Sequence, residues 1–167
     1  MSPPWSKPLE VDRLAEARAE VDFAIPLAEL PGLRSARPEI GGEVHGRVSF
    51  GREQGFAAAQ LSMRGVATLT CQRCMQPLPL PLETATRVAL ITSEAEASRV
   101  GDDLEPVLAE GGRISVGQLI TEELLLMLPI VPLHEGDGNC ASAPAATAET
   151  GLETHRPFAR LGELLKR

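Results

Sequence analysis

Apolar residues alternate with polar ones through much of the first 92 residues, and this period of two constrains the fold more than any other feature of the chain. Successive side chains of a strand point to opposite faces, so such alternation predicts strands with one buried face. Val21, Phe23 and Ile25 share one such face. We therefore predict about five strands, covering residues 19–27, 43–50, 56–64, 66–71 and 84–92.

Glycine and proline separate the predicted strands. Residues 27–41 form a turn-rich connection, and residues 51–55 predict a hairpin turn. Pro77, Pro79 and Pro81 lack the backbone N–H that a central strand donates, so we expect no regular pairing there. Short connections of this kind favour an antiparallel meander.

The second half of the chain changes to a helical period. Residues 93–112 are acidic and rich in glycine, which predicts a loop. Ser115 predicts an N-cap with Gln118 as its capping-box partner, and the helix 116–128 should end before Pro129. Glu122 and Glu123 mark its solvent side, whereas its wide apolar face predicts deep burial. That face consists of Val116, Leu119, Ile120, Leu124, Leu125, Leu126, Met127 and Leu128.

These patterns predict an α+β fold, in which an antiparallel β-meander or partial barrel packs against one main α-helix and the tails are disordered. Residues 1–18 are expected to be an N-terminal tail or a weak helix, and residues 19–140 a single domain. Residues 141–155 are rich in Ala, Thr, Ser and Glu and predict a disordered linker. Residues 156–167 predict a short amphipathic docking segment, which packs either on its own domain or on a partner.

The formal net charge of −7 is unevenly distributed, because residues 1–90 carry ten basic and ten acidic side chains whereas residues 91–167 carry six and thirteen. The acidic half should repel phosphates and favours a basic partner protein, although solubility alone also explains such a charge. An aromatic content of 3% argues against a module that stacks RNA bases. The chain starts without an apolar signal segment and has no membrane-spanning run, so we expect a cytoplasmic protein.

Three cysteines allow three interpretations. Cys71 and Cys74 form a CxxC pair at the end of a predicted strand, and His134 and Cys140 follow the predicted helix. A CxxC pair at the end of a strand is typical of a zinc knuckle. His134 and Cys140 would complete such a site and bring the number of ligands to four. A thiol oxidoreductase needs a helix N-terminus at its CxxC, and the prolines after Cys74 disfavour that helix. Reduced, buried thiols without metal remain the third interpretation.

The sequence contains none of the common catalytic motifs, which indicates a protein that is not an enzyme. No catalytic residue, membrane or small-molecule substrate is therefore expected. Arg47, Arg64 and Arg87 alternate onto the polar faces of predicted strands. We expect these three arginines to be the candidate contacts to RNA phosphate.

Several stretches together resemble the bacterial YceD family. They are the knuckle at residues 71–74 with Pro77 nearby, the helix-to-proline run at residues 119–134, Cys140, and the Pro-Phe-Ala segment within residues 156–161. The knuckle and the helix-to-proline run are specific in combination, whereas neither would be alone. The resemblance covers the chain from about residue 20 to its end.

The resemblance implies a ribosome biogenesis factor that supports synthesis, processing or stability of 23S rRNA in the large subunit. It implies a structural Zn²⁺ held by Cys71, Cys74 and Cys140, with His134 as the fourth ligand, and it transfers no catalytic residue. The implied partners are precursor 23S rRNA or a basic large-subunit ribosomal protein. A chaperone-like module that binds only such a protein is the first alternative, and a CxxC thiol oxidoreductase is the second.

Overall fold

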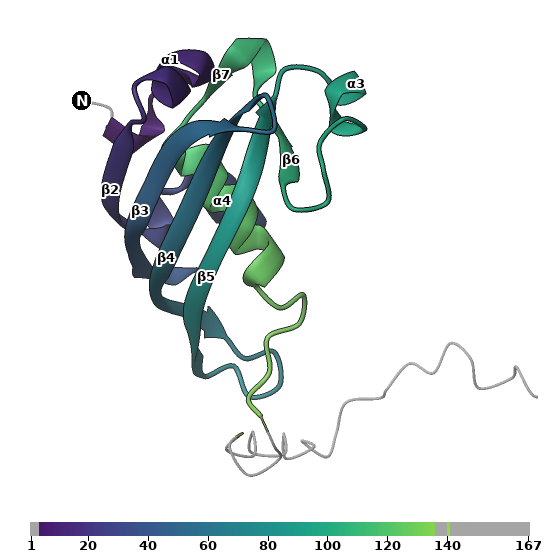
Figure 1. Ribbon diagram of the computed structural model, residues 1–167. Helices are drawn as coiled ribbons and strands as arrows, with labels where there is room; N and C mark the ends of the chain where they lie inside the picture. Colours follow the sequence, from purple (N-terminus) through teal and green to yellow (C-terminus); the bar gives the residue numbers. More distant parts are fainter. Residues whose placement is uncertain (1–3, 136–139, 141–167) are drawn as a thin grey trace, which may run out of the picture.

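The computed structural model describes residues 4–135 and residue 140 (Figure 1). Its strands are β1 (Leu9–Glu10), β2 (Glu20–Pro26), β3 (Gly41–Glu53), β4 (Phe56–Thr70), β5 (Pro77–Ile91), β6 (Glu105–Leu108) and β7 (Arg113–Ile114). Its α-helices are α1 (Val11–Glu16), α2 (Pro31–Ala36), α3 (Glu94–Ala97) and α4 (Val116–Met127). Short 3-10 helices span Pro4–Ser6, Leu27–Glu29 and Glu110–Gly112.

The main sheet has the order β2-β3-β4-β5-β6, and β1 pairs separately with β7. Strands β2 to β5 pair antiparallel in chain order and form the predicted meander. Gln54 and Gly55 join β3 to β4 with φ angles of 53° and 87°, the conformation that suits a tight hairpin turn. The α+β prediction is confirmed, and the sheet is open, with β2 and β6 at its edges, rather than closed into a barrel.

Gly65 lies inside β4, which is one continuous strand where the sequence predicted two. A Cβ atom at this position would lie 2.1 Å from the carbonyl oxygen of Glu43 on β3. The glycine therefore allows a close approach of two backbones and does not mark a turn.

β5 begins at Pro77, so the prediction that its prolines prevent regular pairing is wrong. Pro77, Pro79 and Pro81 each pair with a residue of β4. Because they recur at every second position, all three direct their nitrogens to the same edge, away from β4. In the described part of the chain, β6 covers that edge only along residues 88–91.

The segment 93–112 is not only a loop, as the sequence predicted, because it contains β6 and the short helix α3. β6 pairs in parallel with β5, so the sheet is mixed and not purely antiparallel. A strand of four residues that includes Pro106 is too short to show a period of two. Its edge position tolerates the proline, which needs no partner for its nitrogen.

Helix α4 forms as predicted and lies across one face of the sheet (Figure 1). The Ser115 side chain accepts a hydrogen bond of 3.1 Å from the backbone N–H of Gln118, which confirms the N-cap. The Gln118 side chain donates to Glu122 at 3.0 Å instead of returning to the cap. The helix buries Val116, Gly117, Leu119, Ile120 and Leu124.

Two leucines of α4 depart from the prediction of deep burial. Leu125 is 41% exposed and Leu126 is 73% exposed, whereas Leu124 is fully buried. Each residue advances about 100° around a helix, so a helix that contacts the sheet along one stripe turns these positions outward. Leu128 is buried as predicted.

The N-terminal segment, expected as a tail or a weak helix, contains α1, which buries Val11 and Ala15. Trp5 packs against α4, where a Cβ atom on Gly117 would lie 2.8 Å from its ring. None of the described helices is long and apolar enough to cross a membrane. The predicted linker 141–155 and docking segment 156–167 lie outside the described residues.

Candidate metal centre

The first half of the candidate site is a tight turn between β4 and β5. Cys71 donates its N–H to the carbonyl of Gln76 at 2.9 Å, and Met75 donates to the carbonyl of Cys71 at 2.8 Å. Met75 has a φ of 59°, a left-handed conformation that is uncommon for a side chain of its kind. These bonds close the turn, and the sulfurs of Cys71 and Cys74 lie within 4.8 Å of each other.

The second half comes from the segment that follows α4. The Arg37 guanidinium donates to the carbonyl oxygens of Pro129 at 2.7 Å and Ile130 at 3.0 Å. The N–H of Gln72 donates to the carbonyl of Pro132 at 2.9 Å, which joins this segment to the knuckle. Arg37 was missed by the sequence analysis, because an arginine in a turn-rich connection carries no sign of its distant partners.

The structure brings all four predicted ligands together. Their donor atoms lie within 4.8 Å of one another. The Cys71 and Cys140 sulfurs are 3.7 Å apart. Nδ1 of His134 lies 3.5 Å from the Cys74 sulfur and 3.7 Å from the Cys140 sulfur.

These distances can be compared with the edges of a zinc tetrahedron. Bond lengths of about 2.3 Å to sulfur and 2.0–2.1 Å to nitrogen give edges of about 3.8 Å between two sulfurs and about 3.6 Å between sulfur and nitrogen. The separation of Cys71 from Cys140 and the two separations from His134 agree with these edges. The donor set therefore fits a tetrahedral ion, and the four residues can hold a metal.

The ring of His134 is oriented by a second contact. Its Nε2 lies 3.2 Å from the carbonyl oxygen of Pro77, which can only accept a hydrogen bond. Nε2 must therefore carry the proton, which leaves the Nδ1 lone pair directed at the sulfurs. A backbone carbonyl that fixes the tautomer in this way is the usual support of a metal-binding histidine.

The environment shifts the pKa values of the Cys71 and Cys140 thiols in opposite directions. Burial opposes ionisation of Cys71, but backbone N–H groups of Cys74, His134 and Arg73 outweigh it and lower the pKa of Cys71 to about 5. Burial raises the pKa of Cys140 to about 11, with further contributions from Cys71 and Cys74. N–H groups directed at a cysteine sulfur stabilise a thiolate, which is the form that binds metal.

The surroundings of Cys71 disfavour thiol redox chemistry. The residue is fully buried, and Cys74 and Cys140 are each 8% exposed. The CxxC lies in a turn that leads into β5, so no helix N-terminus follows it. A reactive redox cysteine is accessible and usually sits at such a helix terminus, and this site offers neither feature.

The three predicted RNA-contacting arginines lie on the exposed face of the sheet, each with a partner. Arg47 binds Asp22 at 2.6 Å and Glu20 at 3.1 Å. The hydrogen bond from Arg47 lowers the pKa of Asp22.

Arg87 binds Glu53 at 2.8 Å. Arg64 donates a hydrogen bond to His45 at 3.0 Å and lies opposite Glu83 in the register of β4 and β5. The strand register places the three arginines on one face together with five carboxylates. Those carboxylates are Glu20, Asp22, Glu43, Glu53 and Glu83.

Comparison with known proteins identifies the family of this chain. Residues 59–165 match the family described as large ribosomal RNA subunit accumulation protein YceD. A curated relative of that name from Haemophilus influenzae is 26% identical over 165 residues, covering 94% of this chain and 95% of the relative. No solved structure matches. The family match covers well over half of the chain and includes all four candidate ligands, and the chain therefore belongs to the YceD family.

Proposed function

We propose that this chain is a non-enzymatic, cytoplasmic factor that supports accumulation of the large-subunit ribosomal RNA, by promoting synthesis, processing or stability of 23S rRNA. The family description and a curated relative spanning nearly the whole chain support this role. The observation that carries the mechanism is the convergence of Cys71, Cys74, His134 and Cys140 on one point. We propose that they hold a structural Zn²⁺.

The proposed zinc is structural because four protein ligands complete its tetrahedron. A catalytic zinc usually keeps one position for water or substrate, and this donor set supplies all four. Zinc here would supply a cross-link between the knuckle after β4 and the segment after α4. Such a cross-link fixes the helix relative to the sheet without any turnover.

A basic large-subunit ribosomal protein is the second candidate for the direct partner, beside precursor 23S rRNA. Charge favours the protein, because the arginines of the exposed sheet face are engaged with acidic groups or with His45. A phosphate would have to replace these carboxylates at Arg47 and Arg87. Nucleic-acid affinity depends on free cationic groups, and a chaperone-like role for a basic protein does not.

Rescue of a deletion strain tests the proposal. Deletion of the gene should lower 23S rRNA relative to 16S rRNA, and the wild-type chain should restore it. His134→Gln should fail to restore it and should lose zinc, whereas His45→Gln on the exposed face serves as the matched control and should rescue. Unchanged 23S rRNA in the deletion strain, with the protein absent by immunoblot, would contradict the function. Full rescue by a zinc-free His134→Gln would contradict the role of the metal.

A further inference from the structure

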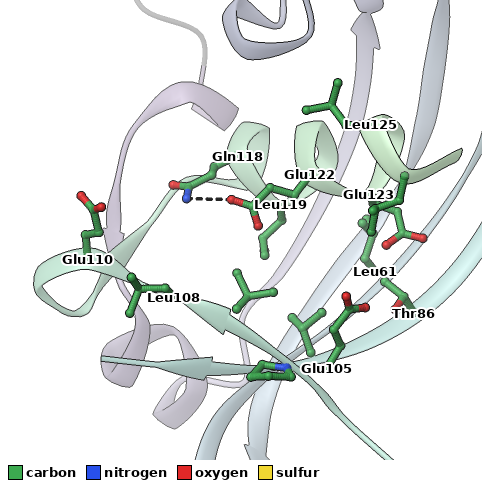
Figure 2. A pocket seen from close by; sticks show the side chains of 14 residues that line it. Leu61, Thr86, Glu105, Leu108, Glu110, Gln118, Leu119, Glu122, Glu123 and Leu125 are labelled. Atoms are coloured by element: carbon green, nitrogen blue, oxygen red, sulfur yellow. Dashed lines mark hydrogen bonds between the residues drawn. The ribbon is translucent and has the colours of Figure 1, made fainter. Parts of the chain in front are cut away.

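A groove lies between α4 and β6 (Figure 2), and none of the four candidate metal ligands lines it. It encloses about 580 Å³, a volume within the range of binding sites for small ligands or several side chains. Helix α4 forms one wall and β6 forms the other, as Figure 2 shows. Neither the proposed zinc nor the exposed face of the sheet uses this surface.

The floor of the groove is apolar. Leu61 of β4, Val88 of β5 and Leu119 of α4 contribute to it, and all three are at most 5% exposed. Leu125 and Leu126 line the groove from α4 and remain 41% and 73% exposed. Exposed leucines beside an apolar floor are the residues that a bound apolar side chain would cover.

The rim of the groove is acidic. All of its charged lining residues are glutamates, namely Glu105 and Glu110 on the β6 side and Glu122 and Glu123 on α4. In Figure 2 the carboxylate of Glu105 rises from the β6 wall towards α4. The groove therefore combines an apolar floor with four carboxylates.

The hydrogen bonds to these carboxylates come from neutral groups. Glu122 accepts from the Gln118 side chain at 3.0 Å, and Glu123 accepts from the Thr84 hydroxyl at 2.8 Å. Within the part of the chain that the structure describes, none of the four rim glutamates forms an ion pair with a lysine or arginine. Among the described residues, no lysine or arginine neutralises these four carboxylates.

We infer that this groove binds a short segment of a partner protein in which lysine or arginine side chains are interspersed with aliphatic ones. The cationic groups pair with Glu105 and Glu122, while the aliphatic groups cover Leu125 and Leu126. A bare cation would leave the floor uncovered, a purely apolar segment would leave the carboxylates unpaired, and nucleic acid would be repelled. The identity of the partner rests on the proposed function, which offers a basic ribosomal protein.

The probe is a fluorescein-labelled peptide that alternates arginine and valine, titrated with the full chain and followed by anisotropy. Wild-type protein should bind it saturably and more weakly as salt rises. Glu105→Gln with Glu122→Gln should weaken binding about tenfold. The control pair Glu43→Gln with Glu83→Gln removes the same charge from the opposite face of the sheet and should change binding by less than about twofold.

The apolar floor has its own test. Leu125→Ser with Leu126→Ser should weaken binding severalfold, and exposure of both side chains keeps the fold intact. A peptide with serine in place of valine should bind wild-type protein with the same severalfold loss, and one with glutamate in place of arginine should not bind. Equal binding of the valine and serine peptides would mean that only charge is recognised, and would overturn the inference.

Two further outcomes would also overturn it. One is the absence of saturable binding to wild-type protein, or an equal loss in the groove and control pairs. The other is a severalfold gain in affinity on changing Leu161→Asp with Leu165→Asp, which would assign the groove to the chain's own C-terminal segment. Failure of this inference can be distinguished from failure of the proposed function. If groove variants that do not bind peptide still restore 23S rRNA, the part of the groove in that function is refuted and the function stands, whereas peptide binding without any rRNA defect on deletion refutes only the function.

Discussion

Removing zinc from the proposed centre should lower the free energy of unfolding by about 4 kcal/mol. The sulfurs of Cys71 and Cys140 lie 3.7 Å apart although the residues are 69 positions apart in the chain. In the chain-entropy treatment of cross-links, closing a loop of this length stabilises the folded state by about 4 kcal/mol near room temperature. The CxxC pair can also hold zinc in the unfolded chain, so this long-range closure is the contribution specific to the fold.

The corresponding change in melting temperature is large enough to measure easily. For a chain of this length, about 4 kcal/mol corresponds to a Tm decrease of roughly 8–16 °C. Circular dichroism melts of protein purified without a metal-affinity tag, before and after chelation, give this shift. Re-addition of zinc should restore the original Tm.

Two histidine variants separate the metal from unspecific effects of the chelator. His134→Gln removes a ligand, so its Tm should already be low and should respond little to chelation. His45→Gln lies outside the centre and should behave like the wild type. If the wild-type protein carries one zinc per chain, and chelation removes it while Tm moves by less than about 2 °C, the cross-link argument is refuted.

Three further predictions concern single residues. In the metal-free protein, the Cys71 thiol has a pKa of about 5 instead of 9.0. Its thiolate therefore adds stability that is complete above pH 9.0 and is lost as the pH falls through 5. An ultraviolet titration of the thiolate should show a midpoint near pH 5, and a midpoint near pH 9 would contradict this prediction. Leu124→Ala should cost about 3 kcal/mol in urea unfolding, whereas exposed Leu126→Ala should cost less than about 1 kcal/mol. Gly65→Ala would place its Cβ 2.1 Å from the Glu43 carbonyl oxygen. Because this clash would push β3 away from β4, the change should cost about 2 kcal/mol in urea unfolding. An unchanged urea midpoint would contradict the register of the two strands.

The predictable part of the fold depends on repeated local signals. The meander follows from alternation over several residues, and α4 follows from its cap at Ser115 and its apolar spacing. β6 was not predictable, because four residues around Pro106 carry no period and their pairing with β5 is non-local. The prolines of β5 were misinterpreted, since the sequence alone does not show which edge of a strand lacks a partner.

The candidate centre was predictable in its ligands but not in its supports. Cysteine and histidine are rare in this chain, so their positions stand out in the sequence. The contacts of Arg37 with the Pro129 and Ile130 carbonyls, and the Pro77 carbonyl beside His134, depend on tertiary structure. Whether zinc occupies the site stays a prediction.

The proposed zinc and the groove share one element, because α4 lines the groove and the segment after it reaches the centre. Leu126 lines the groove, and His134 follows eight residues later. Backbone carbonyls of the segment between them accept hydrogen bonds from Arg37 and Gln72. The bond from Thr84 to Glu123 ties the same helix to β5. A zinc cross-link at the end of this segment would limit its motion and hold α4 at a fixed distance from the β6 wall. The proposed metal would thereby contribute to binding without touching the partner, because it would order the helix that carries two of the four rim carboxylates before the partner arrives.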